Sequence, residues 1–118
     1  MNLSSLSNEL DLDATLDRLC GDEALLLEIL DLFLDEFCTE QQNLITLVHS
    51  GNFVGLASKA HYFKGIAQNL GLINFPPEVM QLEQAAKRND SGACLQSIES
   101  LKRIAATLLA LRKGPQAA

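Results

Sequence analysis

A chain of 118 residues is long enough to bury one hydrophobic core and too short for two ordinary domains, so we expect a single domain over residues 1–118. Of these residues, 47% are hydrophobic but only 5% are aromatic, and none is tryptophan, a composition that favours helices over sheets. The net charge of −6 argues against a nucleic-acid-binding protein, which needs clustered Lys and Arg.

Two helices are predicted in the N-terminal part of the chain. Leucines set among acidic residues over 8–19 predict a short amphipathic helix that ends before Gly21. Asp22 can then cap a second helix, in which apolar residues recur at steps of three and four up to about Ser50. At 1.5 Å per residue, this second helix would be roughly 40 Å long.

Three more helices are predicted in the rest of the chain. Gly51 then acts as a stop for the second helix, and Asn52 can cap a third over residues 53–70. The fourth helix begins at the Asn-Phe-Pro-Pro sequence of residues 74–77, because proline is tolerated in a first helical turn. A fifth follows the Asn-Asp-Ser sequence of residues 89–91 and ends at the stop that Gly114 begins. Short connections imply antiparallel neighbours, so the predicted fold is all-α: an up-down antiparallel four-helix bundle with an additional short N-terminal helix.

The cysteines bear on metal binding, and the N-terminal sequence bears on the cellular compartment of the protein. Cys20, Cys38 and Cys94 lie in leucine-rich helical patterns without CxxC spacing, so we interpret them as buried apolar residues rather than disulfide or zinc ligands. Residues 1–10 lack a basic start and an apolar run, and the richest apolar stretch, residues 24–34, contains two acids. We expect a cytoplasmic monomer with no membrane segment and no metal or other cofactor of its own.

Charge is unevenly distributed along the chain. Residues 1–40 hold eleven acidic residues and a single basic one, Arg18, whereas residues 41–118 hold four acidic and eight basic residues. Both histidines, His49 and His61, lie in the more basic part. This part is therefore the better suited to binding a phosphate group.

One face of the helix predicted over 53–70 combines residues of complementary chemistry. Spaced i, i+3, i+4 and i+7 along adjacent turns, they are His61, Lys64, Gly65 and Gln68. A neutral imidazole is a good nucleophile at cellular pH, because the pKa of an unperturbed imidazole is about 6.5. Lys64 can attract phosphoryl oxygens, and the missing side chain at Gly65 would let a partner approach His61.

Each of these residues also has a plainer explanation. A lone helical histidine is usually a surface residue, a single lysine is usually solvated, and a glycine inside a helix is more often a helix-packing contact than a docking site. Gly65 costs the helix about 1 kcal/mol relative to alanine, so some compensating role is expected. Spacing alone therefore leaves a helical domain of unknown role.

The sequence of residues 60–71, AHYFKGIAQNLG, resembles the AHxxKGxxxxxG signature of histidine-containing phosphotransfer (HPt) domains. The upstream segment LCGDEALLLEILDLFLDEF and the downstream segment LEQAAKRND are also similar to that family. The resemblance covers about residues 9–112 and leaves ragged ends at 1–7 and 114–118. It implies a four-helix bundle, which agrees with the fold predicted from the helix pattern.

The resemblance implies roles for individual residues. In HPt domains the histidine corresponding to His61 is phosphorylated, and it exchanges the phosphoryl group with the aspartate of a response-regulator receiver domain in two-component signalling. Glu83 lies on the flank of the apolar stripe of the predicted fourth helix. In similar domains, a Glu or Gln in this position accepts a hydrogen bond from imidazole Nδ1 and leaves Nε2 free to attack. The expected reactive residues are therefore His61, Lys64 and Glu83. The expected partner-docking residues are Gly65, Gln68 and Lys87.

By the same resemblance, the chain is expected to be a phosphoryl carrier without catalysis of its own. The partner receiver would supply Mg²⁺ and the acidic pocket, and a hybrid sensor histidine kinase is a second partner to consider. The alternative is a non-phosphorylated helical adaptor that docks a receiver or a kinase, which the presence of His61 disfavours. Glu83 has an alternative of its own, as an exposed residue paired only with Lys87. The sequence departs from the family at Ile66 and Gln68, where small residues are common.

Overall fold

The computed structural model describes residues 6–113, which form five helices and no strand. In chain order the helices are α1 (Leu12–Arg18), α2 (Glu23–His49), α3 (Phe53–Asn69), α4 (Phe75–Lys87) and α5 (Ser91–Lys113). The predicted all-α class is thus confirmed, and four of the five predicted helices lie where the sequence placed them. The stop expected at Gly114 and the outermost residues of the ragged ends lie outside the described residues.

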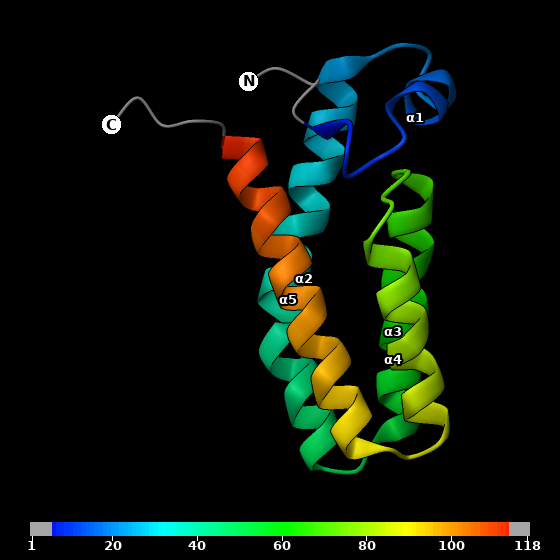
Figure 1. Cartoon of the computed structure of the whole chain (residues 1–118), viewed down its shortest axis with the longest axis vertical. Helices are drawn as coiled ribbons and strands as arrows, with labels where there is room; N and C mark the ends of the chain where they lie inside the picture. Colours follow the sequence, from blue (N-terminus) through cyan, green and yellow to red (C-terminus); the bar gives the residue numbers. More distant parts are fainter. Residues whose placement is uncertain (1–5, 114–118) are drawn as a thin grey trace.

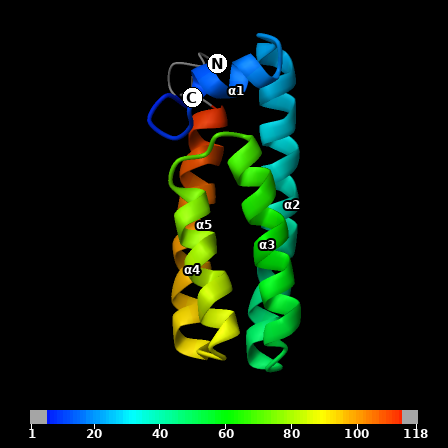
Figure 2. The same ribbon diagram turned by 90° about the vertical axis from the view of Figure 1, so that its right-hand side faces the viewer.

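The four long helices run side by side as an up-down bundle (Figure 1). Around the bundle, α2 packs against α3, α3 against α4, α4 against α5, and α5 against α2. The short helix α1 crosses one end of the bundle, above the connection between α3 and α4 (Figure 2). Within the described residues, no helix is long and apolar enough to cross a membrane.

The helix ends are set by the residues that the sequence analysis expected. The Asp22 carboxylate accepts a hydrogen bond from Leu25 N at 3.0 Å, and the Asn52 side chain accepts one from Gly55 N at 2.9 Å. Each side chain satisfies an N–H group that has no partner inside the helix, as an N-cap does. These caps fix where α2 and α3 begin, and hence the register of the bundle.

The first helix is shorter than predicted, because Leu12–Arg18 is helical and the rest of the expected range 8–19 is not. Asp11 N donates to Gly71 O at 2.8 Å, and Ile73 N donates to Glu9 O at 2.8 Å. These bonds pair residues 9–11 with the α3–α4 connection, and Asp11, the residue before α1, has an extended backbone. The prediction of a helix from residue 8 was wrong because this pairing joins segments about 60 residues apart in the chain.

Gly71 makes the close approach of these two segments possible. Its φ of +73° is a left-handed conformation that costs glycine little. A Cβ atom there would collide with the hydroxyl of Thr15, which is buried and donates to Leu70 O at 2.9 Å. Arg18 of α1 also donates to Asn69 O at 2.7 Å. Helix α1 is thereby fixed to the C-terminal end of α3.

The centre of the core is a cluster of four phenylalanine rings. They come from three helices: Phe33 and Phe37 of α2, Phe63 of α3, and Phe75 of α4. Their rings meet edge to face, with Phe33 and Phe75 5.0 Å apart and Phe37 and Phe63 5.4 Å apart between centroids. Edge-to-face contact is a favoured geometry for aromatic pairs. The cluster therefore fixes the rotation of α3 about its axis.

The prediction that all three cysteines are buried holds for one of them. Cys94 is fully buried, and this burial raises the pKa of its thiol. Cys20 and Cys38 are exposed. Cys20 follows the end of α1 in a left-handed conformation (φ of +56°), and Cys38 comes one residue after buried Phe37, which turns it to the outside of α2.

We predict that Phe37→Ala lowers the free energy of unfolding by about 3–5 kcal/mol, because it removes a fully buried ring and leaves a cavity. Chemical denaturation followed by circular dichroism measures this loss. Val54→Ala is the control, since Val54 is 85% exposed and should change stability by less than about 0.5 kcal/mol. Similar losses for the two variants would contradict the assignment of the core.

Candidate functional site

The strip predicted on the third helix lies on the outward side of α3. His61 and Phe63 are two residues apart, which places them on nearly opposite sides of the helix. Phe63 is buried in the core, and the side chain of His61 is 71% exposed. Gly65 and Gln68, one and two turns further along the same face, are also exposed. The imidazole is therefore accessible to another molecule.

Glu83 of α4 lies beneath the imidazole. Among residues 6–113 it is the only buried residue with a charged side chain, with 8% of its surface exposed. Its Oε2 atom is 3.4 Å from His61 Nδ1, longer than a typical N–H···O hydrogen bond but within ion-pair range. The sequence placed Glu83 on the flank of the fourth helix, and the packing of α3 against α4 turns that flank toward His61.

Two lysines contact the same carboxylate. Lys64 Nζ donates a hydrogen bond to Glu83 Oε1 at 2.9 Å, and Lys87 Nζ lies 3.6 Å from Glu83 Oε2. Glu83 is therefore not an exposed residue paired only with Lys87. Lys64, which was expected to face an incoming phosphoryl group, instead contacts Glu83, and its side chain is only 20% exposed.

These contacts keep Glu83 ionised. The hydrogen bond from Lys64 is the main cause that lowers the pKa of the Glu83 carboxyl below its ordinary value of 4.5. Burial acts in the opposite direction, and the charges of Lys64, Lys87 and His61 lower the pKa further. The site thus holds one carboxylate among three basic side chains, at the surface between α3 and α4.

Gly65 has open space around it. A Cβ atom built on Gly65 would meet no atom within 4 Å. A glycine that served helix packing would have a neighbouring helix close to this position, so the packing explanation for Gly65 fails. Gly65 therefore leaves the surface of α3 without a side chain one turn from His61.

A further contact at the site was missed by the sequence analysis. The hydroxyl of Tyr62 donates a 2.7 Å hydrogen bond to Glu36 Oε1 of α2. This bond raises the pKa of Tyr62 above its ordinary value of 10.0. The available signal was that the only tyrosine in the chain directly follows His61, but its partner could be found only from the packing of α2 against α3.

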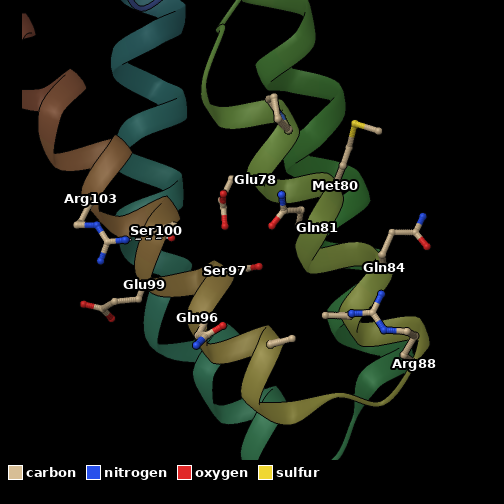
Figure 3. Close-up of a pocket in the computed structure, with 13 residues that line it drawn as sticks. Glu78, Met80, Gln81, Gln84, Arg88, Gln96, Ser97, Glu99, Ser100 and Arg103 are labelled. Atoms are coloured by element: carbon tan, nitrogen blue, oxygen red, sulfur yellow. Dashed lines mark hydrogen bonds between the residues drawn. The ribbon is translucent and has the colours of Figure 1, made fainter.

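The candidate site residues lie apart from the hollows described for residues 6–113. A hollow lies between α4 and α5, where glutamines, acids and two arginines line an open groove (Figure 3). None of His61, Lys64 and Glu83 lines it. Residues 6–113 also contain no group of three or more His, Cys, Asp or Glu side chains placed to hold a metal ion. A histidine whose side chain is this exposed can meet a group presented by another protein.

Comparison with known families agrees with this geometry. The family model for the Hpt domain matches residues 28–114, about three quarters of the chain. The chain belongs to the Hpt family. Hpt domains act as phosphoryl carriers in phosphorelays rather than as catalytic enzymes, and they interact with receiver domains. No curated protein and no solved structure matches the chain.

The part of this Hpt domain that the family model matches includes all of α3, α4 and the candidate site. It begins within α2, so α1 and the segment before it lie outside the match. The resemblance inferred from the signature is thus confirmed as family membership. The roles of the individual residues around His61 remain predictions.

We predict that the stability difference between the wild type and Glu83→Gln depends on pH. Because the pKa of Glu83 is lowered in the folded protein, its stabilising effect is present above the ordinary pKa of 4.5 and is lost as the pH falls through the folded value. The free energy of unfolding of the wild type should exceed that of Glu83→Gln by about 1–2 kcal/mol near pH 7, and the difference should be much smaller near about pH 3. Urea unfolding at several pH values measures it.

The control is Glu99→Gln, which removes an exposed carboxylate that lies 3.7 Å from Lys102. This substitution should change stability by less than about 0.5 kcal/mol at each pH. A difference between the wild type and Glu83→Gln that did not vary with pH would show that the Glu83 charge contributes nothing to folding.

Proposed function

We propose that this Hpt domain accepts a phosphoryl group on His61 and exchanges it with the aspartate of a response-regulator receiver domain. The observation that carries the proposal is the position of the signature histidine: it is exposed on α3, one turn from a bare glycine, with Glu83 beneath its Nδ1 atom. An accessible nucleophile with a fixed ring orientation is what in-line transfer between two proteins needs.

The proposed transfer uses the phosphoryl group of an aspartyl phosphate on the receiver. The lone pair of His61 Nε2 attacks the phosphorus atom, and an N–P bond forms as the P–O bond to the aspartate breaks. The aspartate leaves as a carboxylate, and the phosphorylated imidazole ring gains a positive charge. Reversal of the same steps returns the group to a receiver, so no water or other reactant is consumed.

Glu83 is the proposed positioning residue for this step. A proton on Nδ1 directed at the Glu83 carboxylate leaves Nε2 as the atom with a free lone pair. The carboxylate also offsets the positive charge that develops on the ring during attack. The 3.4 Å separation can shorten as that charge develops, since charge-assisted hydrogen bonds are shorter than neutral ones.

Lys64 and Lys87 are proposed to neutralise the phosphoryl oxygens. Both Nζ atoms lie within 4 Å of the Glu83 carboxylate, so both are near the imidazole that this carboxylate contacts. Lys87 has the more accessible side chain, at 57% exposed against 20% for Lys64. We infer that Lys87 can reach an incoming phosphoryl group directly, whereas Lys64 must first loosen its hydrogen bond to Glu83.

The partner is proposed to contribute the remaining chemistry. The receiver would provide Mg²⁺ and the acidic pocket that holds the phosphorylated aspartate, and this chain would provide the nucleophile and the positive charges around it. A hybrid sensor histidine kinase is a second candidate partner, because such a kinase can carry a receiver domain. The adaptor alternative differs in one respect, that His61 would never carry a phosphoryl group.

We predict that His61→Gln abolishes labelling of the chain by a phosphorylated receiver, because glutamine has no nucleophilic ring nitrogen. Radiolabelled phosphate transferred from each of a panel of purified receiver domains measures the effect. His49→Gln is the matched control, since His49 is exposed at the end of α2 and outside the signature, and it should label normally. Persistent labelling of His61→Gln would refute the assignment, and no labelling of the wild type by any receiver would favour the adaptor.

We predict that Gly65→Gln reduces the transfer rate roughly tenfold or more, because the added side chain occupies the open space that a partner needs near His61. Folding should be retained, since the side chain meets no neighbour and glutamine is a better helix former than glycine by up to about 1 kcal/mol. Rapid-quench transfer assays and thermal melts measure the two effects. Gly92→Gln on α5 is the control, and transfer by Gly65→Gln at the rate of this control would remove the docking role of Gly65.

A further inference from the structure

The side of His61 that faces α2 carries a fixed acid–phenol pair. The Tyr62 hydroxyl donates to Glu36 at 2.7 Å, and its ring meets the buried ring of Phe63 edge to face at 5.3 Å. Held at both ends, the tyrosine keeps one orientation although it is 48% exposed. Glu36 is held in turn by the hydroxyl, so its exposed carboxylate has a defined position beside Tyr62, the residue that follows His61.

The charge of Glu36 has no counter-charge within the described chain. Its recorded partner is the neutral Tyr62 hydroxyl, and no cation of residues 6–113 is recorded within ion-pair distance of it. One turn further along α2, Glu40 differs in this respect, because it pairs with Lys59 of α3 at 3.4 Å. Glu36 is therefore an acid held in place at the surface and available to a cation from outside.

Exposed apolar side chains lie on the helix faces that carry Glu36 and His61. Leu32 is one turn before Glu36 on the same face of α2 and is 64% exposed. On α3, Val54 shares the outward face with His61, two turns before it, and is 85% exposed. Together with Tyr62, these are three of the six large apolar side chains recorded as exposed. Exposed apolar side chains along adjoining helix faces are typical of a surface that a partner covers.

The surface around His61 is also electrically polarised. Lys64 and Lys87 lie on its α4 side, near Glu83, whereas Glu36 lies on its α2 side. A partner that docks over His61 therefore meets positive charge on one side and negative charge on the other. This arrangement favours one orientation of the partner over the reverse, since like charges brought together are repulsive.

We propose that the Glu36–Tyr62 pair determines which receiver domain docks on this chain, by accepting a Lys or Arg side chain of the receiver at the Glu36 carboxylate. The proposal rests on the proposed function, because it takes the receiver as the partner. The complementary receiver carries an acidic pocket opposite His61 and a basic residue displaced from that pocket toward α2. An exposed charge at the rim of a transient interface acts mainly on association and on partner choice.

The test uses a chain that carries His61→Gln and a panel of purified receiver domains. Fluorescence anisotropy at low and high salt measures the dissociation constant of each complex. In this background no transfer can occur, so the measurement reports docking alone. Glu36→Gln should weaken binding of the matching receiver by about two- to fivefold and Glu36→Lys by about tenfold. Tyr62→Phe, which keeps the ring and frees the carboxylate, should weaken binding by about twofold. Each effect should shrink at high salt.

The matched control is Asp35→Lys, which changes the net charge as much as Glu36→Lys does but lies about 100° around α2 from Glu36. It should leave the dissociation constant nearly unchanged. Exchanging the contacting basic residue of the receiver for Glu should restore binding to Glu36→Lys. The proposal is wrong if the dissociation constant is the same for Glu36 and Glu36→Lys chains, or if no receiver binds. If receiver binding depends on Glu36 but His61 of the wild-type chain is never phosphorylated, the carrier function is wrong and the docking role of Glu36 stands.

Discussion

The burial of Phe63 among the rings of Phe33, Phe37 and Phe75 is the contact on which the candidate site depends. An α-helix has a fixed rotation per residue, so placing one side chain in the core determines the direction of every other side chain on that helix. With Phe63 inside, His61 is exposed, Lys64 is turned toward α4 and Tyr62 toward α2. The packing of hydrophobic rings thereby orients the polar residues around the histidine.

Glu83 has an electrostatic effect in addition to its proposed positioning role. Two lysines at the surface of one helix pair repel each other, and a protonated His61 ring would add a third positive charge beside them. A nearly buried carboxylate between them lowers that repulsion and keeps the three groups together. Because the carboxylate is shared by all three, a change at any one of them alters the balance of charge at the other two.

The sequence could predict those structural features that depend only on residues close together in the chain. The caps at Asp22 and Asn52 and the extent of the four long helices follow from residues within a few positions of each other, and those predictions were confirmed. The start of α1 depends on pairing with residues 71–73, and the exposure of Cys38 depends on which face of α2 the bundle covers. Neither can be deduced from neighbouring residues.

In the candidate site, too, the local features could be predicted from the sequence and the features that depend on helix packing could not. The strip on α3 follows from helical spacing within one segment, and the position of Glu83 could be anticipated from the stripe on its own helix. The hydrogen bond from Lys64 to Glu83 and the one from Tyr62 to Glu36 require the relative register of separate helices. Gly71, the last residue of the signature, is instructive here: its space is taken by the Thr15 hydroxyl of a helix outside the family match. A residue of a functional signature can thus have a structural role instead of a chemical one. The substitutions tolerated at positions 15 and 71 are therefore expected to be coupled through evolution.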